Sequence, residues 1–296
     1  MRTSTTVQSP KGLSVAKSTA EDVAEKSNKL FGKKSKIFLG AKLPDKEDLD
    51  YIALPNWWKA ATNTVGLPFR KIVMVAGDSD SGKTSFAIAA IKAAQEQKFE
   101  VLYVETEGKT TKKDFTDWGV DPAKIYILQE SVVENIYDDI IDFIDELPEE
   151  KKLLLVIDSL GSVISKHDAE RSMADSGTKP GGKGKSNREG LNKLIAKRTQ
   201  RDIALLLINY TYDNIGSPGK TNAGGKALNF FSSLTYQTSR KQWLEKTVKG
   251  DKVRIGARVQ WKLFKNHLDR TNPGPKTIEF DIKADGFHYV DGKSDE

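Results

Sequence analysis

The eight residues GDSDSGKT at positions 77–84 constrain the fold of this chain more than any other stretch. They fit the pattern G-x-x-x-x-G-K-[ST], and the first glycine ends an apolar segment, RKIVMVAG, that is typical of a buried strand. A helical pattern follows over residues 84–97. Glycines between a strand and a helix let successive backbone N–H groups point at one anion. The stretch therefore predicts a phosphate-binding loop, or P-loop, within an α/β fold.

Two residues of the P-loop have specific expected roles toward a nucleoside triphosphate. Lys83 is expected to reach the β- and γ-phosphates, and the Thr84 hydroxyl to ligate Mg²⁺. A second metal ligand is expected at the end of a neighbouring buried strand, where Asp158 closes the segment LLLVID. Helix N-capping is the alternative role of Asp158. The predicted nucleotide-binding set is Gly77, Asp78, Ser79, Asp80, Ser81, Gly82, Lys83, Thr84 and Ser85.

A pair of carboxylates ends a second apolar strand, VLYVETEG. Glu105 and Glu107 are two residues apart, so they lie on one face of an extended chain. Placing carboxylates next to a buried strand costs desolvation free energy unless they are paired or bind a ligand. Nucleotide hydrolysis needs a group that orients or deprotonates water, and Glu107, the outer acid, is the predicted base, with Lys83 as its catalytic partner. The alternative is that both acids lie where the chain leaves the core and enters solvent, without a catalytic role.

Strand and helix patterns alternate along the middle of the chain. The segments FEVLYVET, KIYILQ, KKLLLVIDS and DIALLLIN are apolar strands, and helices are expected over the acidic residues 134–150 and over 186–201. Such alternation predicts a mainly parallel central sheet with helices on both faces. After Phe231 the strands alternate polar and apolar residues, which predicts an antiparallel extension at the C-terminal side.

Composition separates an N-terminal arm, residues 1–50, from a core, residues 51–296. The arm is rich in Ser, Thr and Lys, and its apolar island Ile37-Phe38-Leu39 either packs on its own domain or adds to a neighbouring subunit. The absence of cysteine excludes disulfides, thiolate metal sites and Cys nucleophiles. No apolar run is long enough to span a membrane, so no membrane partner and a cytoplasmic location are expected. The net charge of +6 permits a polyanionic partner.

Taken together, these motifs resemble the RecA-type recombinases, most closely the UvsX-like recombinases of T-even-type phages. The resemblance covers about residues 50–285 and is carried, in family order, by GLPFRKIVMVAG, the P-loop, YVETEG, WGVDPAKI, LLVIDSLGSVISKHD, LLINYTY and AGGKALNFFSS. It implies a RecA-like P-loop ATPase core that uses ATP and Mg²⁺ and whose hydrolysis depends on DNA. It also implies a helical homo-oligomer on single-stranded DNA that pairs this strand with duplex DNA in homologous recombination and repair. A bacteriophage origin would place the protein in the bacterial host cytoplasm.

The resemblance also implies roles for residues at the nucleotide site. Glu107 matches the catalytic glutamate of the family and Asp158 its metal-shell aspartate. Asn209 and Tyr210 match the nucleotide-sensing positions at the end of a strand, where Tyr210 replaces a glutamine or, in the phage branch, often a histidine. Asp114 takes the place of an aromatic residue that stacks near adenine.

Three further positions are implied to act across the interface between protomers. Lys265 matches a lysine that reaches the ATP of the neighbouring protomer. His267 stands where the family has a second such lysine, and Arg270 is the alternative candidate for that role.

Two DNA-contacting loops are implied, at about residues 167–188 and 210–226. Glycines let backbone amides approach phosphates there, and basic side chains neutralise the phosphate charge. Because aromatic residues are few in both loops, backbone tracking is expected rather than base stacking. A disordered linker is the alternative for the Lys/Gly run 179–185. The predicted DNA-binding residues are Lys183, Lys185, Arg188, Lys220, Asn222, Gly224, Gly225 and Lys226.

Two other functions stay open beside the recombinase. The first is a RecA-fold ring helicase or motor, which the N-terminal arm disfavours. The second is a non-catalytic, ATP-binding DNA coat or mediator protein, which the retention of the P-loop, Glu107 and Asp158 disfavours. Single-strand-binding and mediator proteins are further candidate partners.

Overall fold

The computed structural model describes residues 49–170, 182–198, 201–213, 220–223, 226–268 and 276–290, together with the isolated residues 22 and 26. The chain divides into two compact units, Met1–Asp48 and Leu49–Glu296. The predicted arm, with its island Ile37-Phe38-Leu39, therefore lies almost wholly outside the described residues. The second unit holds the elements that follow.

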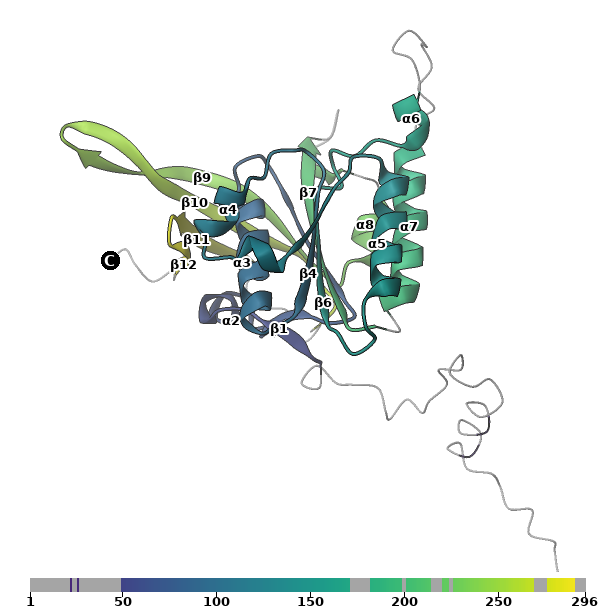
Figure 1. The fold of residues 1–296 in the computed structure, drawn as a ribbon. Coiled ribbons are helices and arrows are strands. Elements are labelled where there is room, and N and C mark those ends of the chain that lie inside the picture. The colour runs from purple at the N-terminus through teal and green to yellow at the C-terminus, as the bar shows by residue number, and fades with distance from the viewer. Residues whose placement is uncertain are drawn as a thin grey trace, which may run out of the picture. The chain divides into compact units, whose positions relative to one another are not determined.

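A central sheet organises the second unit, and ten of its strands lie in the described part of the chain (Figure 1). The strand order is β12-β11-β10-β9-β3-β7-β6-β4-β5, and β8 pairs with β7. The strands from β5 to β9 in this order are all parallel to their neighbours, which confirms the predicted parallel sheet. Their bounds are β3 Ile72–Gly77, β4 Glu100–Glu105, β5 Tyr126–Gln129, β6 Leu153–Asp158, β7 Ile203–Asp213 and β9 Leu234–Val248.

The predicted antiparallel extension is also confirmed. It consists of β10 Asp251–Asn266, β11 Thr277–Lys283 and β12 Gly286–Val290, each antiparallel to the strand before it. The outer halves of β9 and β10 form a hairpin that projects beyond the other strands (Figure 1). Three short strands complete the set: β1 Tyr51–Ala53 pairs with β2 Gly66–Pro68, and β8 Lys220–Asn222 pairs with β7.

Helices cover both faces of the sheet, as Figure 1 shows. Successive residues of a strand point to opposite faces, so the fully buried strands β3 and β6 supply two separate cores. Val73 and Val75 belong to the core under α3, whereas Ile72 and Met74 belong to the core under α5 and α7. The helices are α2 Asn56–Thr62, α3 Lys83–Glu96, α4 Lys112–Thr116, α5 Val133–Glu146, α6 Lys166–Glu170, α7 Gly182–Arg198 and α8 Lys226–Phe231, and a 3₁₀ turn spans Pro122–Lys124.

Aromatic rings fix the position of α3. Phe86, in the second turn of this helix, stacks on Trp58 at 5.1 Å between ring centroids and meets the edge of Trp261 at 5.0 Å. All three side chains are fully buried. Such pairs are stabilising beyond the area that they bury, by about 0.5–1.5 kcal/mol each. These contacts therefore hold the start of α3, which belongs to the P-loop, against α2 and β10.

The helix α7 begins four residues earlier than the predicted start at Ser186. Residues 182–188, predicted as part of the first DNA-contacting loop, form its first turns instead. The physical reason lies in Ser186, whose hydroxyl donates to the Glu134 carboxylate at 2.6 Å and contacts the Gly182 carbonyl at 3.2 Å. Glu134 also accepts the backbone N–H of Lys166 at 2.8 Å, so one acid at the start of α5 holds α6 and α7.

Part of the predicted second loop is likewise regular structure. The strand β7 continues to Asp213, and Thr211 and Tyr212 pair with β8. A hairpin-like pairing satisfies the backbone groups that a loop would expose to water. Gly224 and Gly225 lie outside the described residues.

Candidate active site

The P-loop connects β3 to α3, and two of its glycines occupy positions where no other residue fits. A Cβ atom on Gly77 would lie 2.1 Å from the Thr238 carbonyl oxygen. Gly82 has φ +80°, and a Cβ there would lie 2.1 Å from Cδ1 of Ile282. Ser81 fastens the loop further, because its hydroxyl shares a 2.6 Å hydrogen bond with that of Thr238 on β9. The loop is thus packed against β9 and β11.

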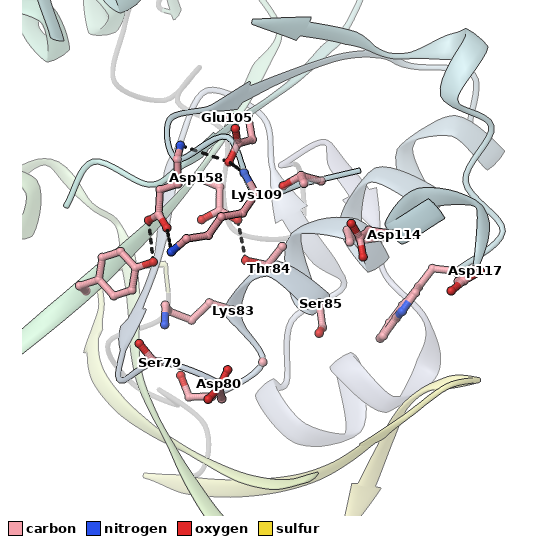
Figure 2. A pocket seen from close by; sticks show the side chains of 17 residues that line it. Ser79, Asp80, Lys83, Thr84, Ser85, Glu105, Lys109, Asp114, Asp117 and Asp158 are labelled. Atoms are coloured by element: carbon pink, nitrogen blue, oxygen red, sulfur yellow. Dashed lines mark hydrogen bonds and ion pairs between the residues drawn. The ribbon is translucent and has the colours of Figure 1, made fainter. Parts of the chain in front are cut away.

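A cleft of about 420 Å³ opens over this loop (Figure 2). This volume lies within the usual range of small-molecule sites, about 300–1,000 Å³. Side chains from the ends of β4, β6 and β7 line it together with the P-loop and the segment around α4. The cleft is therefore at the carboxyl ends of parallel strands, where open α/β sheets bind ligands.

Lys83 lies at the centre of the cleft with only 6% of its surface exposed. Its Nζ donates to the Asp78 carbonyl oxygen at 2.6 Å and lies 4.8 Å from the centre of the Tyr210 ring. Burial lowers the pKa of Lys83, although the charges of Asp158, Asp78 and other nearby acids oppose this effect. A buried ammonium with one carbonyl partner is well suited to bind phosphate oxygens.

Thr84 and Asp158 meet as the sequence predicts. The Thr84 hydroxyl donates to Oδ2 of Asp158 at 2.8 Å, and the Tyr103 hydroxyl donates to the same oxygen at 3.2 Å. Burial raises the pKa of Asp158, against the opposing hydrogen bonds from Thr84 and Tyr103 and the charge of Lys83. Mg²⁺ is usually held by one or two such oxygens together with substrate phosphates and water. The Thr84 hydroxyl and the Asp158 carboxylate supply two such oxygens beside the P-loop, so this pair fits Mg²⁺.

The two acids after β4 have different environments. Glu105 is 4% exposed, and its carboxylate accepts the backbone N–H groups of Glu107, Gly108 and Lys109 at 3.2, 2.5 and 3.2 Å. It therefore closes the turn after the strand. Figure 2 shows Glu105 and Lys109 beside the P-loop residues.

Glu107 takes part in the cleft through its side chain. Its Oε1 accepts hydrogen bonds from Tyr210 at 2.6 Å and Ser159 at 3.1 Å, and its Oε2 accepts one from Lys109 at 2.5 Å. Burial by itself would raise the pKa of Glu107, but these donors outweigh it and hold the pKa below the ordinary value. The carboxylate is therefore charged near neutral pH, which is the form that a general base requires.

Tyr210 and Asn209 connect the cleft with the predicted second DNA loop. Tyr210 bridges Lys83 and Glu107, with its ring on the first and its hydroxyl on the second. Asn209 is fully buried and donates to the Ala223 carbonyl at 2.7 Å, while Ala223 donates its N–H to the Tyr210 carbonyl at 2.8 Å. Tyr210, whose ring lies under the Lys83 ammonium, and its neighbour Asn209 are thus both hydrogen-bonded to Ala223, just after β8.

The predicted DNA-binding residues on α7 differ in exposure. Lys185 and Arg188 are exposed, and Lys185 lies 3.8 Å from Glu189. Lys183 is half-buried, and its Nζ donates to the Gly161 carbonyl at 2.5 Å, close to Tyr210. Of the second group, only backbone positions are described for Lys220, Asn222 and Lys226, and Gly224 and Gly225 lie outside the described residues.

The predicted interface residues are only partly described. Lys265 donates to the carbonyls of Asn229 and Phe230 at 2.7 and 3.0 Å, which caps the C-terminal end of α8. His267 is exposed, and Arg270 lies outside the described residues. Phe230, next to the Lys265 ammonium, leaves 78% of its surface exposed.

Trp118 is a cleft residue that the sequence patterns did not reveal. It lines the cleft four residues after Asp114 and packs edge-on against Phe287 at 6.0 Å. Asp114, at the position expected for an aromatic residue, instead accepts the N–H and hydroxyl of Thr111 and caps α4. The spacing of four residues, about one helical turn, was the available signal.

Comparison with known proteins gives consistent matches over most of the chain. The family described as the RecA N-terminal domain matches residues 18–287. The chain is 28% identical to Protein RecA of Sulfurovum sp. over 284 residues, which is 93% of this chain and 77% of that protein. It is 27% identical to Protein RecA of Campylobacter hominis over 272 residues, covering 90% and 74%.

The match to Protein RecA of Malacoplasma penetrans, 28% identical over 207 residues, covers 69% of this chain and only 60% of that relative. These matches do not test the narrower resemblance to phage recombinases. Among the helices of the described residues, none is both long and apolar enough to cross a membrane.

Proposed function

The chain belongs to the RecA recombinase family, and from this premise we propose that it is an ATP-dependent DNA strand-exchange protein. Membership implies a family of DNA-dependent ATPases that use ATP and Mg²⁺, bind DNA and self-associate. For this chain, the proposal is a helical filament on single-stranded DNA that pairs this strand with homologous duplex DNA. ATP binding favours the filament, and hydrolysis favours its release. A phage origin, as in the UvsX-like branch, is part of the proposal.

One observation carries this proposal. Lys83, the pair Thr84 and Asp158, and Glu107 converge in one cleft, and Tyr210 joins that cleft to the β7–β8 region by hydrogen bonds. A nucleotide-binding protein without catalysis has no need for a charged, hydrogen-bonded carboxylate facing the P-loop lysine.

Each side chain has a defined part in hydrolysis. When nucleotide binds, the Lys83 ammonium gives up its hydrogen bond to the Asp78 carbonyl and donates to β- and γ-phosphate oxygens. The N–H groups of the P-loop donate to the phosphates as well. Thr84 and Asp158 are the residues that would hold Mg²⁺, and a bound ion would supply positive charge to the phosphates. Glu107 orients the attacking water and accepts its proton. Trp118 supplies the apolar surface in the part of the cleft near α4, where we place the adenine.

Tyr210 is the proposed sensor of nucleotide. Its ring and hydroxyl occupy the space between Lys83 and Glu107, so a γ-phosphate drawn to Lys83 competes with them. Movement of Tyr210 strains its backbone hydrogen bond with Ala223 and alters the segment that follows β8. Phosphate occupancy is thereby passed to the second DNA-contacting segment.

DNA contacts are proposed on three surfaces. Lys183, Lys185 and Arg188 on α7, and the segment 220–226, are the sites for the primary strand. The outer part of the β9–β10 hairpin carries Lys246, Lys249 and Lys252, all exposed, and is proposed to contact phosphates of the duplex. Phosphate contacts of this kind position DNA without reading its sequence.

Contacts between protomers are proposed at two places. Exposed Phe230 and neighbouring Lys265, with His267 or Arg270, face the ATP of the next protomer. The edge strand β5 exposes Tyr126 at 49% and Ile127 at 47%. The Ile37-Phe38-Leu39 segment of another protomer is proposed to add to this edge.

The deciding experiment measures ATP hydrolysis with and without single-stranded DNA and images the same samples by electron microscopy. The proposal expects DNA-stimulated hydrolysis and open helical filaments that require ATP. Closed rings would favour the helicase or motor, and filaments without hydrolysis would favour the DNA coat or mediator.

A further inference from the structure

One acidic side chain of the P-loop, that of Asp80, lies in the cleft proposed to bind nucleotide. Asp80 lines the cleft, exposes 67% of its side chain and adopts φ 54°, in the left-handed region that Asp and Asn tolerate best among residues with a side chain. A nucleoside triphosphate brings several negative charges into the same space. Like charges within one cleft repel even at the effective dielectric constant of a protein surface. An Asp80 carboxylate without a positive partner would therefore oppose nucleotide binding.

Arg240 on β9 compensates this charge. Its Nη1 lies 3.1 Å from Oδ2 of Asp80. Arg240 is two residues after Thr238, which bonds Ser81, so both side chains are on the face of β9 that lies against the P-loop. Among the described residues, those that line the cleft include Asp80 and not Arg240. Arg240 thus reaches the site through Asp80 rather than through direct contact with the ligand.

The hairpin holds the Arg240 side chain in place. Its guanidinium carbon lies 4.1 Å from the centre of the Trp243 ring, and that of Arg254 lies 4.3 Å from the same centre. Irregularities in the β9–β10 register fall between Arg258 and Val259 and between Arg254 and Gly256. Such bulges re-aim side chains and bend the strand. An arginine packed on an aromatic ring loses less freedom when it pairs with a carboxylate.

We propose that Arg240 is a positioning residue for nucleotide binding, which neutralises Asp80 in the P-loop and is itself held by Trp243. The inference rests on the proposed function in one respect, that the ligand of the cleft is a nucleoside triphosphate. It predicts that Arg240 affects affinity for nucleotide and not the chemical step, because it touches neither the phosphates nor Glu107.

The test titrates the full-length chain with a fluorescent ATP analogue and Mg²⁺, and measures KM and kcat for ATP in parallel. Arg240→Ala is expected to weaken analogue binding about threefold to tenfold, a range set by partly exposed charge pairs. KM rises by a similar factor while kcat changes little, the pattern of lost uniform binding. Arg240→Lys retains the charge and keeps most of the affinity.

The rescue variant is Asp80→Asn, which keeps the backbone preference and removes the charge. By itself it binds the analogue at least as tightly as the wild type, and the double variant Arg240→Ala/Asp80→Asn binds about as tightly as Asp80→Asn alone. A double variant as weak as Arg240→Ala would overturn the inference, because Arg240 would then act on the ligand directly. Since Asp80→Asn removes no packing, weaker binding by this variant would also overturn it, even if Arg240→Ala failed to fold.

The matched control is Arg258→Ala, which breaks a two-bond pair with Asp281 at 2.7 and 3.1 Å between β10 and β11. It is expected to leave affinity for the analogue within about twofold. Equal weakening by Arg258→Ala and Arg240→Ala would assign the effect to general loosening of the sheet and contradict the proposal. A wild-type chain that binds no analogue would instead refute the proposed function.

Discussion

At the scale of single residues, the hydrogen bonds around Glu107 determine what its carboxylate can do. Tyr210, Ser159 and Lys109 all donate to it, and together they outweigh the effect of burial on its pKa. Because one of these donors, Tyr210, also covers Lys83, the base and the phosphate-binding lysine share one partner. We expect Tyr210 to link the binding of phosphate at Lys83 to the ability of Glu107 to act as a base.

The substitution Glu107→Gln tests the catalytic assignment. The amide keeps the size of the side chain and can still accept from Tyr210, so binding of ATP and DNA should persist. Loss of the base is expected to lower kcat by about 100-fold or more. Single-turnover hydrolysis in the presence of single-stranded DNA measures this effect, with Glu105→Gln as a variant that should affect stability more than the chemical step. Near-normal turnover in Glu107→Gln would assign the base to another residue.

Tyr210→Phe tests the link between sensor and base. The ring over Lys83 stays, but a donor to Glu107 is lost, so the pKa of Glu107 should rise from its lowered value. A general base loses activity as the pH falls through its pKa, and a raised pKa therefore moves the acidic limb of the kcat profile to higher pH. A profile that stays in place, or moves to lower pH, would contradict a direct role for the Tyr210 hydroxyl.

At the scale of elements, β9 is the strand that joins the separate parts of the site. It lies parallel to β3, bonds the P-loop through Thr238 and Arg240, and continues into the basic hairpin. The same strand thus touches the nucleotide loop and carries the lysines proposed to contact duplex DNA.

The hairpin lysines are tested by the double substitution of Lys246 and Lys252 to Ala. Both are exposed and distant from the core, so folding should be unaffected. Each phosphate contact contributes about 0.9 to the slope of log K against log salt for duplex DNA, and the slope should fall by about 1–2. Substitution of Lys59, on α2, and Lys151, just before β6, is the matched control, because both lysines are exposed and lie outside the proposed DNA-binding surfaces. Equal slopes for the two double variants would remove the hairpin from the DNA-binding surface.

At the scale of the whole molecule, the described core and the described cleft residues lie in one compact unit. The second compact unit, Leu49–Glu296, holds both hydrophobic clusters and every described residue of the cleft. Assembly is expected to need the N-terminal arm with Ile37-Phe38-Leu39 in addition to the interface residues proposed on this unit.

Deletion of residues 1–45 should separate folding from assembly. The truncated chain is expected to melt within a few degrees of the full chain, since no core residue of the second unit is removed, and to be monomeric by light scattering. It should still bind the ATP analogue. Filaments of normal length on single-stranded DNA, seen by electron microscopy, would refute the role of the arm.

The sequence by itself determined the class of fold and the position of the P-loop between a strand and a helix. Buried apolar strands alternate with helices, and the spacing of Gly77, Gly82 and Lys83 has a local physical cause, so both could be predicted correctly. The pairing of Thr84 with Asp158 was also predictable, because parallel strands bring their carboxyl ends to one edge.

Only the tertiary structure decided the partners within the site. Glu105 closes a turn while Glu107 faces the cleft, Tyr210 bridges Lys83 and Glu107, and Arg240 pairs with Asp80. Several of these contacts join residues more than a hundred positions apart in the chain, and they depend on strand order, on register and on the irregularities of the β9–β10 pairing. Local patterns encode how each segment folds and which faces it buries, but the contacts between segments arise only when the sheet places β3 between β7 and β9.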